Sequence, residues 1–140
     1  MAISFDVAGI KTFTSGNNDL SLTVGSGLNR YMIAVGGFNT TSMSYNGVSL
    51  TNITNFTSPI IDGNQQTVKA FGLANPDSGT HNLNIPYSDA FGGSVAVAVY
   101  NGVASVGQPE VTNTGYSNNG SNNTQVISLN TTITTITDNA

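Results

Sequence analysis

Hydrophobic residues in this chain fall in short runs that are separated by clusters of Gly, Asn, Asp, Ser and Pro. None of the runs has the three-to-four-residue spacing of an amphipathic helix. Many short strands divided by turn-forming residues are typical of a sandwich or barrel. The pattern predicts an all-β chain: an antiparallel β-sandwich of the jelly-roll or Ig-like type, in which residues 1–140 form a single domain.

The same pattern locates the strands and two of the turns. Asn46-Gly47 is the pair best suited to the positive φ angles of a two-residue type I′ turn, so a hairpin is expected there. The segment Asn75–Gly79 combines Pro, which fixes φ, with Gly, which tolerates the left-handed conformation, and predicts a second turn. Together these turns favour a meander of hairpins. The predicted strands are Ile3–Val7, Ile10–Thr14, Leu20–Val24, Arg30–Phe38, Ser42–Tyr45, Val48–Thr54, Thr67–Leu73, His81–Ile85, Ser94–Tyr100, Thr124–Leu129 and Thr131–Thr137.

Two of these strands, Arg30–Phe38 and Ser94–Tyr100, are apolar on both faces. An antiparallel strand in a sandwich ordinarily alternates apolar with polar residues, because its outer face meets water. The outer faces of these two strands must therefore be covered, either by loops of the same chain or by another subunit. The apolar residues of the first strand are Tyr31, Ile33 and Val35 on one face and Met32, Ala34 and Phe38 on the other; in the second strand, Val95, Val97 and Val99 alternate with Ala96, Ala98 and Tyr100.

The C-terminal part of the chain is more polar. Residues 112–124 form a low-complexity polar segment, which predicts an exposed, mobile loop with Tyr116 as its one aromatic residue. Thr131–Thr137 is predicted as a strand from its β-branched residues, although Ile133 and Ile136 fall on opposite faces. Without a following strand, one edge of this strand is either exposed and able to pair with another chain, or capped by a neighbouring element.

Few residues in the chain can perform chemistry. It contains three Lys and Arg, seven Asp and Glu, one His, and neither Cys nor Trp. The sequence contains no Gly-x-Ser-x-Gly motif whose serine His81 could activate as a general base, so His81 is expected to be structural. The acidic residues are scattered, and Asp62-Gly63-Asn64 lacks the remaining oxygen ligands of a calcium loop. Since acid-base and nucleophilic catalysis need such groups at fixed places, we expect no enzymatic activity, no metal and no cofactor.

The charge argues against two classes of partner. The formal net charge is -4, and the three cations Lys11, Arg30 and Lys69 are too few for the usual phosphate contacts of nucleic-acid binding. The same shortage argues against an anionic membrane surface. The segment Met1–Asp6 has neither the basic region nor the apolar stretch of a signal peptide or membrane helix, so synthesis and folding in a cytoplasm are expected.

A sugar-binding module is the main alternative on fold grounds, since many are small sandwiches rich in Asn and Thr. Such modules usually bind through flat aromatic side chains, and the chain has no Trp. The aromatic residues that the pattern places in loops, and hence the candidate surface contacts, are Tyr87, Phe91 and Tyr116.

Five segments, taken in order, carry a resemblance to a known family: Met1–Asp6, Asn29–Gly36, Ser44–Thr51, Phe71–Leu83 and Ala98–Val103. They resemble a β-sandwich family that recurs in tailed-phage structural proteins and in bacterial surface proteins. The resemblance implies an antiparallel sandwich with a non-enzymatic role and transfers no catalytic residue. Similar members continue past the segment that matches 134–140 with an aromatic-led strand. This sequence is therefore either a fragment that lacks one or more C-terminal strands, or a sandwich completed by something else.

The expected function is that of a non-enzymatic virion structural protein of a phage, either a capsid decoration protein or another exposed head or tail component. Its expected partners are other copies of itself and other virion proteins, with neither nucleic acid nor membrane. Its expected location is a virion assembled in the host cytoplasm. The alternative is a carbohydrate-binding or cell-surface adhesion module, extracellular or on a cell surface, with weak glycan contact through loop aromatic residues.

Overall fold

The computed structural model describes residues 2–14, 16–37, 40–57, 67–87 and 92–103, together with the backbone of 115–118 and 125–128. Within these ranges the secondary structure is entirely β, as the hydrophobic pattern predicts. The chain divides into two compact units, Met1–Ser105 and Val106–Ala140. The strands are β1 (Ser4–Phe13), β2 (Gly16–Val24), β3 (Tyr31–Gly37), β4 (Ser44–Tyr45), β5 (Val48–Ser49), β6 (Thr51–Thr57), β7 (Thr67–Ala74), β8 (Gly79–Tyr87), β9 (Gly93–Asn101), β10 (Gly115–Asn118) and β11 (Gln125–Ser128).

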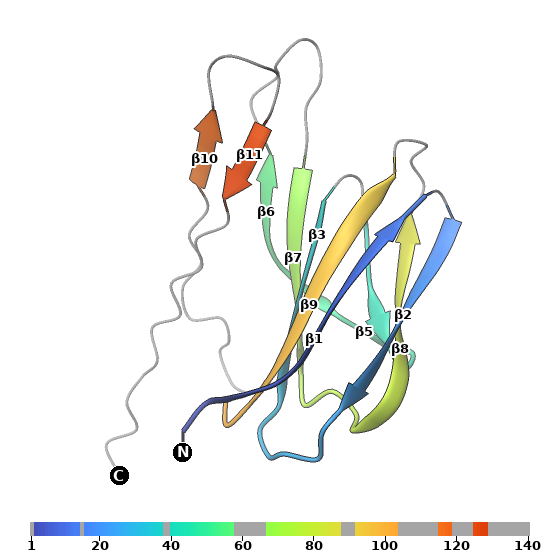
Figure 1. Ribbon diagram of the computed structural model, residues 1–140, viewed down its shortest axis with the longest axis vertical. Helices are drawn as coiled ribbons and strands as arrows, with labels where there is room; N and C mark the ends of the chain where they lie inside the picture. Colours follow the sequence, from blue (N-terminus) through green and yellow to red (C-terminus); the bar gives the residue numbers. More distant parts are fainter. Residues whose placement is uncertain are drawn as a thin grey trace. The chain divides into compact units, whose positions relative to one another are not determined.

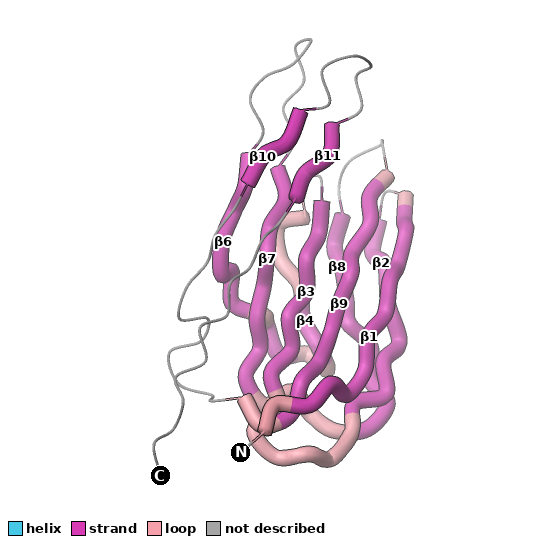
Figure 2. Tube along the Cα trace, turned by 60° about the vertical axis from the view of Figure 1, so that its left-hand side comes forward, coloured by secondary structure: helices cyan, strands magenta, loops and turns pink. Residues whose placement is uncertain are grey.

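The first unit contains two antiparallel sheets. One has five strands in the order β1-β9-β3-β7-β6, and the other has four in the order β2-β8-β4-β5. Figure 2 shows the five strands side by side in this order. Four strand pairs are nested in the sequence: β1 pairs with β9, β2 with β8, β3 with β7, and β4 with β5. The earlier strands therefore fold back on the later ones, as in one long antiparallel hairpin, and the strand pairs are divided between the two sheets.

The meander expected from the turns is wrong for most of this unit. In its described strands, consecutive strands pair only at β4–β5 and β6–β7. Elsewhere the chain passes from one sheet to the other, as it does from β1 to β2 and from β8 to β9 (Figure 1). The turn residues correctly mark where the chain reverses. The pairing itself depends on contacts between strands that are distant in sequence, which turn chemistry does not specify.

One hydrophobic core lies between the two sheets, and both sheets contribute alternate residues to it. Period-two alternation explains this, because successive side chains of a strand point to opposite faces. The buried hydrophobic residues are Phe13, Leu22, Val24, Met32, Ala34, Met43, Tyr45, Leu50, Phe71, Leu83, Ile85, Tyr87, Val95, Val97 and Val99.

Strand β1 is continuous, whereas the sequence predicts two strands with a break at Ala8-Gly9. Gly9 pairs with Val97, a core residue, and therefore faces the opposite sheet. A Cβ atom at this position would lie only 3.0 Å from Cδ2 of Leu22 and 3.1 Å from Cδ2 of Leu20. Gly9 is thus a position where two leucines approach the backbone closely, and it does not form a turn.

The hairpin predicted at Asn46-Gly47 is confirmed, with φ angles of 46° and 79°. It joins β4 to β5. The predicted turn in 75–79 also contains left-handed residues, Asn75 with φ of 49° and Gly79 with φ of 105°. This second turn joins strands of different sheets, and the backbone amide of Asn75 donates a hydrogen bond of 2.8 Å to the carbonyl of Arg30, just before β3.

In the second unit, β10 and β11 form an antiparallel pair, with Gly115 opposite Ser128 and Asn118 opposite Gln125. Strand β11 lies within the predicted strand 124–129, whereas β10 lies within the segment 112–124 that the sequence predicts as a polar loop. Strand pairing uses backbone groups, so a polar composition does not prevent it. The predicted strand 131–137, Phe38 and the segment 62–64 lie outside the described residues.

Candidate functional site

The outer face of the four-stranded sheet is polar. Across it, the Asp19 carboxylate accepts hydrogen bonds from the side-chain amides of Asn82 at 3.3 Å and Asn84 at 2.8 Å. The hydroxyls of Thr23 and Thr80, a directly opposed pair of β2 and β8, lie 2.9 Å apart. These neutral groups and one carboxylate satisfy one another across strands and remain exposed to water.

The outer face of the five-stranded sheet has the opposite character. In its central strand β3, Met32 and Ala34 belong to the core, so Ile33 and its neighbours at alternate positions point outward. The register places Ile33 opposite Ala98 of β9 and Gly72 of β7. We call this surface the apolar face; its residues are Phe5, Ala8 and Ile10 of β1, Ala96, Ala98 and Tyr100 of β9, Tyr31, Ile33 and Val35 of β3, Val68, Ala70 and Gly72 of β7, and Ile53 and Phe56 of β6.

The two-sided apolar character predicted for segments 30–38 and 94–100 is thus present in β3 and β9. One side of each strand faces the core and the other belongs to the apolar face. In an antiparallel sandwich the outer side is ordinarily polar. Here only the four-stranded sheet follows that rule, so the two layers of the unit differ in what they present outward.

The apolar face carries no charged side chain among the described strand residues. The two lysines of the five-stranded sheet point to its other side. Lys11 pairs with the core residue Val95, and Lys69 pairs with Gly36, where a Cβ atom would meet the buried Met43. Contact at the apolar face can therefore form without desolvating a charge, which is the costliest part of burying a protein surface.

Large and small side chains alternate along one row of the apolar face. One row of the register runs from Ile10 of β1 over Ala96 of β9 and Val35 of β3 to Ala70 of β7. Ile10 is 75% exposed, while Val35 is half-buried. In this row, the small alanines of β9 and β7 thus lie beside the larger side chains of β1 and β3.

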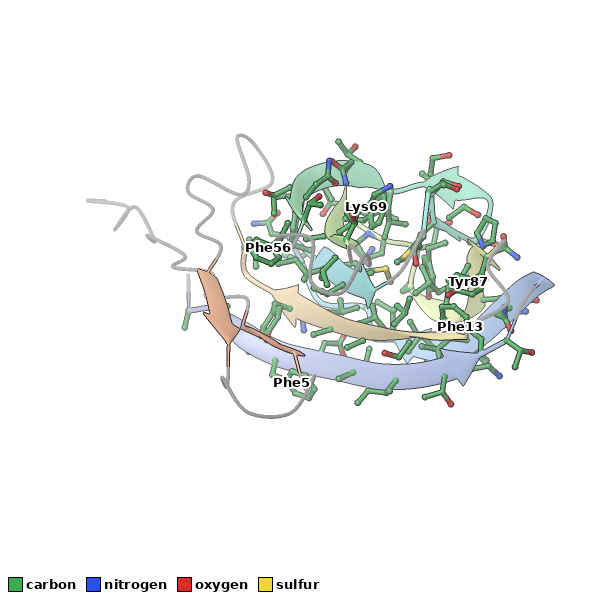
Figure 3. All side chains as sticks on the ribbon, turned by 90° about the horizontal axis from the view of Figure 1, so that it is seen from above. Phe5, Phe13, Phe56, Lys69 and Tyr87 are labelled. Carbon is green, nitrogen blue, oxygen red and sulfur yellow. The ribbon has the colours of Figure 1, made fainter. Side chains whose placement is uncertain are left out.

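Phe5 reaches the apolar face because β1 is bulged at Asp6. Phe5 lies opposite Tyr100, and Val7 lies opposite the next residue, Val99, so Asp6 is the extra residue. Figure 3 shows Phe5 on the side of β1 away from the core, whereas Phe13 points between the sheets. The Phe5 ring is 61% exposed and packs edge-on against Tyr100, with ring centroids 6.0 Å apart.

The carboxylate of Asp6 holds this bulge. It accepts a hydrogen bond of 2.9 Å from the backbone amide of Gly25, just after β2. A Cβ atom at Gly25 would lie 2.8 Å from Oδ1 of Asp6, so the close approach depends on glycine. The exposure of Phe5 is therefore tied to a contact with the end of β2 in the other sheet.

Tyr31 is the most buried side chain of the apolar face, at 8% exposure. It lies over Gly72 of the neighbouring strand, where an added Cβ atom would collide with the Tyr31 hydroxyl and contact Ile53. Burial raises the pKa of Tyr31 above its ordinary value, because the phenolate would be desolvated. Tyr31 therefore stays neutral at physiological pH and preserves the uncharged character of the face.

The structure differs from the sequence-based expectation for Tyr87, which the pattern places in a loop. Tyr87 is the last residue of β8 and is only 4% exposed. Its ring packs edge-on against Phe13, with centroids 4.7 Å apart (Figure 3), and its hydroxyl donates to the Gly92 carbonyl. The strand continues through Pro86, which carries Tyr87 into the core. Phe91 and the side chain of Tyr116 lie outside the described residues.

His81 has the surroundings expected of a structural residue. Its Nε2 atom lies 3.2 Å from the Ser78 carbonyl oxygen, and its ring packs edge-on against the buried Tyr45 with centroids 5.7 Å apart. In the described parts of the chain, no group of three or more His, Asp or Glu side chains could hold a metal ion. The same parts contain no helix of the length and hydrophobicity needed to cross a bilayer.

Sequence reasoning missed the two exposed large hydrophobic residues of the apolar face, Phe5 and Ile10. Both fall in predicted strands, where an aromatic or branched residue is ordinarily assigned to the core. The sequence offered one sign of outward-facing residues: Phe5, Val7 and Ile10 are spaced by two and then three positions, so they cannot all lie on one face of a regular strand. That signal becomes specific only when the bulge at Asp6 is known.

Comparison of the chain with protein-family models, with curated proteins and with solved structures gives no match. The resemblance to a phage-associated sandwich family therefore stays a prediction. The distinguishing element of the structure is the uncharged, apolar outer face of the five-stranded sheet.

Proposed function

We propose that this protein is a non-enzymatic structural component of a phage virion, either a capsid decoration protein or another exposed head or tail protein. It assembles through protein–protein contacts made by the apolar face. Its partners are virion proteins, including further copies of this chain, and its location is the virion.

The observation that carries the proposal is the contrast between the two outer faces. Burying an exposed large apolar side chain such as Phe5 or Ile10 contributes about 1.5–3 kcal/mol each. That gain is available only when another surface covers them. Contiguous exposed apolar surface on a folded unit is typical of protein interaction sites. The polar face, where Asp19 is bonded to two Asn amides, gains nothing comparable from burial.

The nested strand pairing supports the jelly roll as the fold type. A jelly roll distributes eight antiparallel strands over two sheets, with the outermost strands of the sequence paired and the innermost strands paired. With β6 set aside as an additional edge strand, the remaining eight strands of the first unit pair in this way. Jelly rolls occur in viral capsid domains and in lectins, so this fold type is compatible with the proposal.

Glycan binding is the second candidate, and the polar face is the surface that favours it. Asp19, Asn82 and Asn84 present carboxylate and amide groups, which can exchange hydrogen bonds with sugar hydroxyls. The face contains no aromatic platform among its described residues, since the candidate Tyr87 is buried in the core. A glycan would therefore have to compete with hydrogen bonds that these groups already make to one another.

Co-sedimentation with phage particles from the strain that encodes the chain tests the proposal. We expect the full chain to sediment with the particles and Ile10→Asp to bind at least about tenfold more weakly, because a carboxylate would be buried without a partner. Ser21→Asp, on the polar face, is the matched control and should bind like the unmodified chain. Failure of the unmodified chain to sediment, together with glycan-array binding that Asn84→Ala abolishes, would favour the second candidate.

A further inference from the structure

We infer that the apolar face is a dimer interface, on which two copies of this chain pack their five-stranded sheets together. The two-fold axis runs along the strands, between β9 and β3. This inference rests on the proposed function, which assigns protein–protein contacts to the apolar face, and it names a second copy of the chain as a partner there.

Charge favours a second copy as the occupant. The chain has a formal net charge of -4, so two copies repel each other wherever their acidic residues meet. The apolar face is the outer sheet surface on which the described strand residues include no charge, whereas the polar face carries Asp19. Two apolar faces can meet without like-charge contact, and a charged partner would find nothing on this face to pair with.

The alternation of large and small side chains favours the same occupant. A two-fold axis between β9 and β3 places β3 of one copy over β9 of the other, and β1 over β7. The register then sets Ile33 over Ala98 of the second copy and Val35 over Ala96 of the second copy. Both of these branched side chains meet an alanine, as the interdigitated packing of two sheets requires, while Tyr31 faces Tyr100 of the second copy.

An axis directly over β3 would pack less well. It would set Ile33 and Val35 against the same residues of the second copy and leave the alanines of β9 over the small residues of β7. In these two rows, large side chains would meet large ones and small side chains would meet small ones, which leaves voids in which dispersion contacts are lost. In the rows of Ile33 and Val35, the side-chain sizes therefore favour the offset axis.

The available area sets the strength of the dimer. Four overlapping strands about 4.8 Å apart, each with about seven residues rising about 3.3 Å, give a footprint of roughly 440 Å² on each copy. The two copies together would bury roughly 900 Å², or somewhat more over corrugated side chains, which is at the low end for specific complexes. The dimer is accordingly weak and depends on protein concentration.

One contact across the interface cannot occur within a single chain and therefore provides the test. Ile10 of β1 and Ala70 of β7 share a row of the register but are separated by two intervening strands, about 14 Å at ordinary strand spacing. The offset axis places Ile10 of each copy directly over Ala70 of the second copy. Opposite charges at these two positions would pair only between copies.

Sedimentation-velocity measurements on the full chain, over about 1 μM to 1 mM, give the dimer Kd. We expect Ile10→Lys and Ala70→Glu each to raise the Kd at least about tenfold. The double variant should regain most of the dimer affinity at low salt, and this regained affinity should disappear at high salt, where the new ion pair is screened. Ser21→Lys on the polar face is the control and should leave the Kd unchanged. Circular dichroism confirms that each variant is folded.

Two results would overturn the inference: a chain that stays monomeric over the whole range, or a folded double variant that dimerises no better than the single variants. These results are separate from those for the proposed function. A monomer that sediments with phage particles would support the proposed function and refute the dimer. A chain that dimerises with the expected charge rescue but binds no particle would support the dimer and refute the role in the virion.

Discussion

Phe5 and Val7 are two residues apart in β1, yet they face opposite sides of the five-stranded sheet. Val7 packs against the core, while Phe5 is 61% exposed on the apolar face. In a regular strand, residues i and i+2 share a face. The bulge at Asp6 breaks that rule and adds an aromatic residue to a surface that the rest of β1 and β9 already makes apolar.

The bulge predicts a specific role for the Asp6 carboxylate. Asp6→Ala removes the acceptor for the Gly25 amide, and we expect it to lower the free energy of unfolding by about 1–3 kcal/mol, the cost of losing a hydrogen bond to a charged group. Asp6→Asn keeps an acceptor oxygen and should lose less. Urea denaturation of the full chain measures both. Equal stability of Asp6→Ala and the unmodified chain would show that the bulge does not need this contact.

The core predicts a clear contrast between two leucines. Leu83 of β8 is 0% exposed and Leu28 is 71% exposed. We expect Leu83→Ala to lower the free energy of unfolding by about 2–5 kcal/mol, since it leaves a cavity between the sheets, and Leu28→Ala to change it by less than about 0.5 kcal/mol. Thermal and urea unfolding provide the measurement. Similar losses for the two variants would contradict the placement of the core.

The sequence predicted the local structure of this chain better than its topology. The all-β class, most strand positions and the Asn46-Gly47 hairpin follow from short-range chemistry, because alternation and positive φ are local properties. The pairing of β1 with β9 and of β3 with β7 joins strands far apart in sequence, and nothing in a single strand specifies its partner. A meander and a nested arrangement share the same turns.

The candidate site was predicted only in part, for a similar reason. The apolar character of β3 and β9 on both faces was visible in the sequence, and it led to the expectation of a covered outer face. Phe5 was missed because its orientation depends on the bulge at Asp6, and Ile10 was missed because alternation alone does not say which face of a strand is buried. Tyr87 was assigned to a loop because the predicted strand ends at Ile85, whereas β8 continues through Pro86 to Tyr87.

The hairpin turn predicts an asymmetry between two glycines. A Cβ atom at Gly47 or at Gly37 would meet nothing within 4 Å, but only Gly47 has a positive φ, of 79°. We expect Gly47→Ala to cost about 1–2 kcal/mol of stability through backbone strain alone, and Gly37→Ala to be neutral or slightly stabilising. Matched urea titrations compare the two. A neutral Gly47→Ala would mean that the turn can change its conformation without loss.

Stability at high pH should depend on Tyr45. Burial raises the pKa of its phenol above the ordinary value, and the nearby Asp77 carboxylate adds to the rise, while Arg30 acts in the opposite direction. A raised pKa in the folded state means that the unfolded chain loses its proton first. The stabilising contribution is therefore complete below about pH 10 and is lost as the pH rises further.

We accordingly expect Tyr45→Phe, which keeps the buried ring but cannot ionise, to lose less stability than the unmodified chain when the pH is raised above about 10. Urea midpoints compared at neutral and alkaline pH give the difference. Tyr31→Phe should act in the same direction, because the pKa of Tyr31 is also raised by burial. Parallel alkaline losses in Tyr45→Phe and the unmodified chain would refute this assignment.

The most direct measurement of the central claim is the accessibility of Ile10 in the assembled protein. The chain has no cysteine, so Ile10→Cys and, as a control on the polar face, Ser21→Cys each create a single reactive thiol. We predict that alkylation of Ile10→Cys is fast in dilute protein and slows at least about tenfold when the chain is concentrated or bound to particles, while Ser21→Cys reacts equally in all states. An alkylation rate at Ile10→Cys that is the same in dilute, concentrated and particle-bound protein would contradict the assignment of the apolar face as a contact surface.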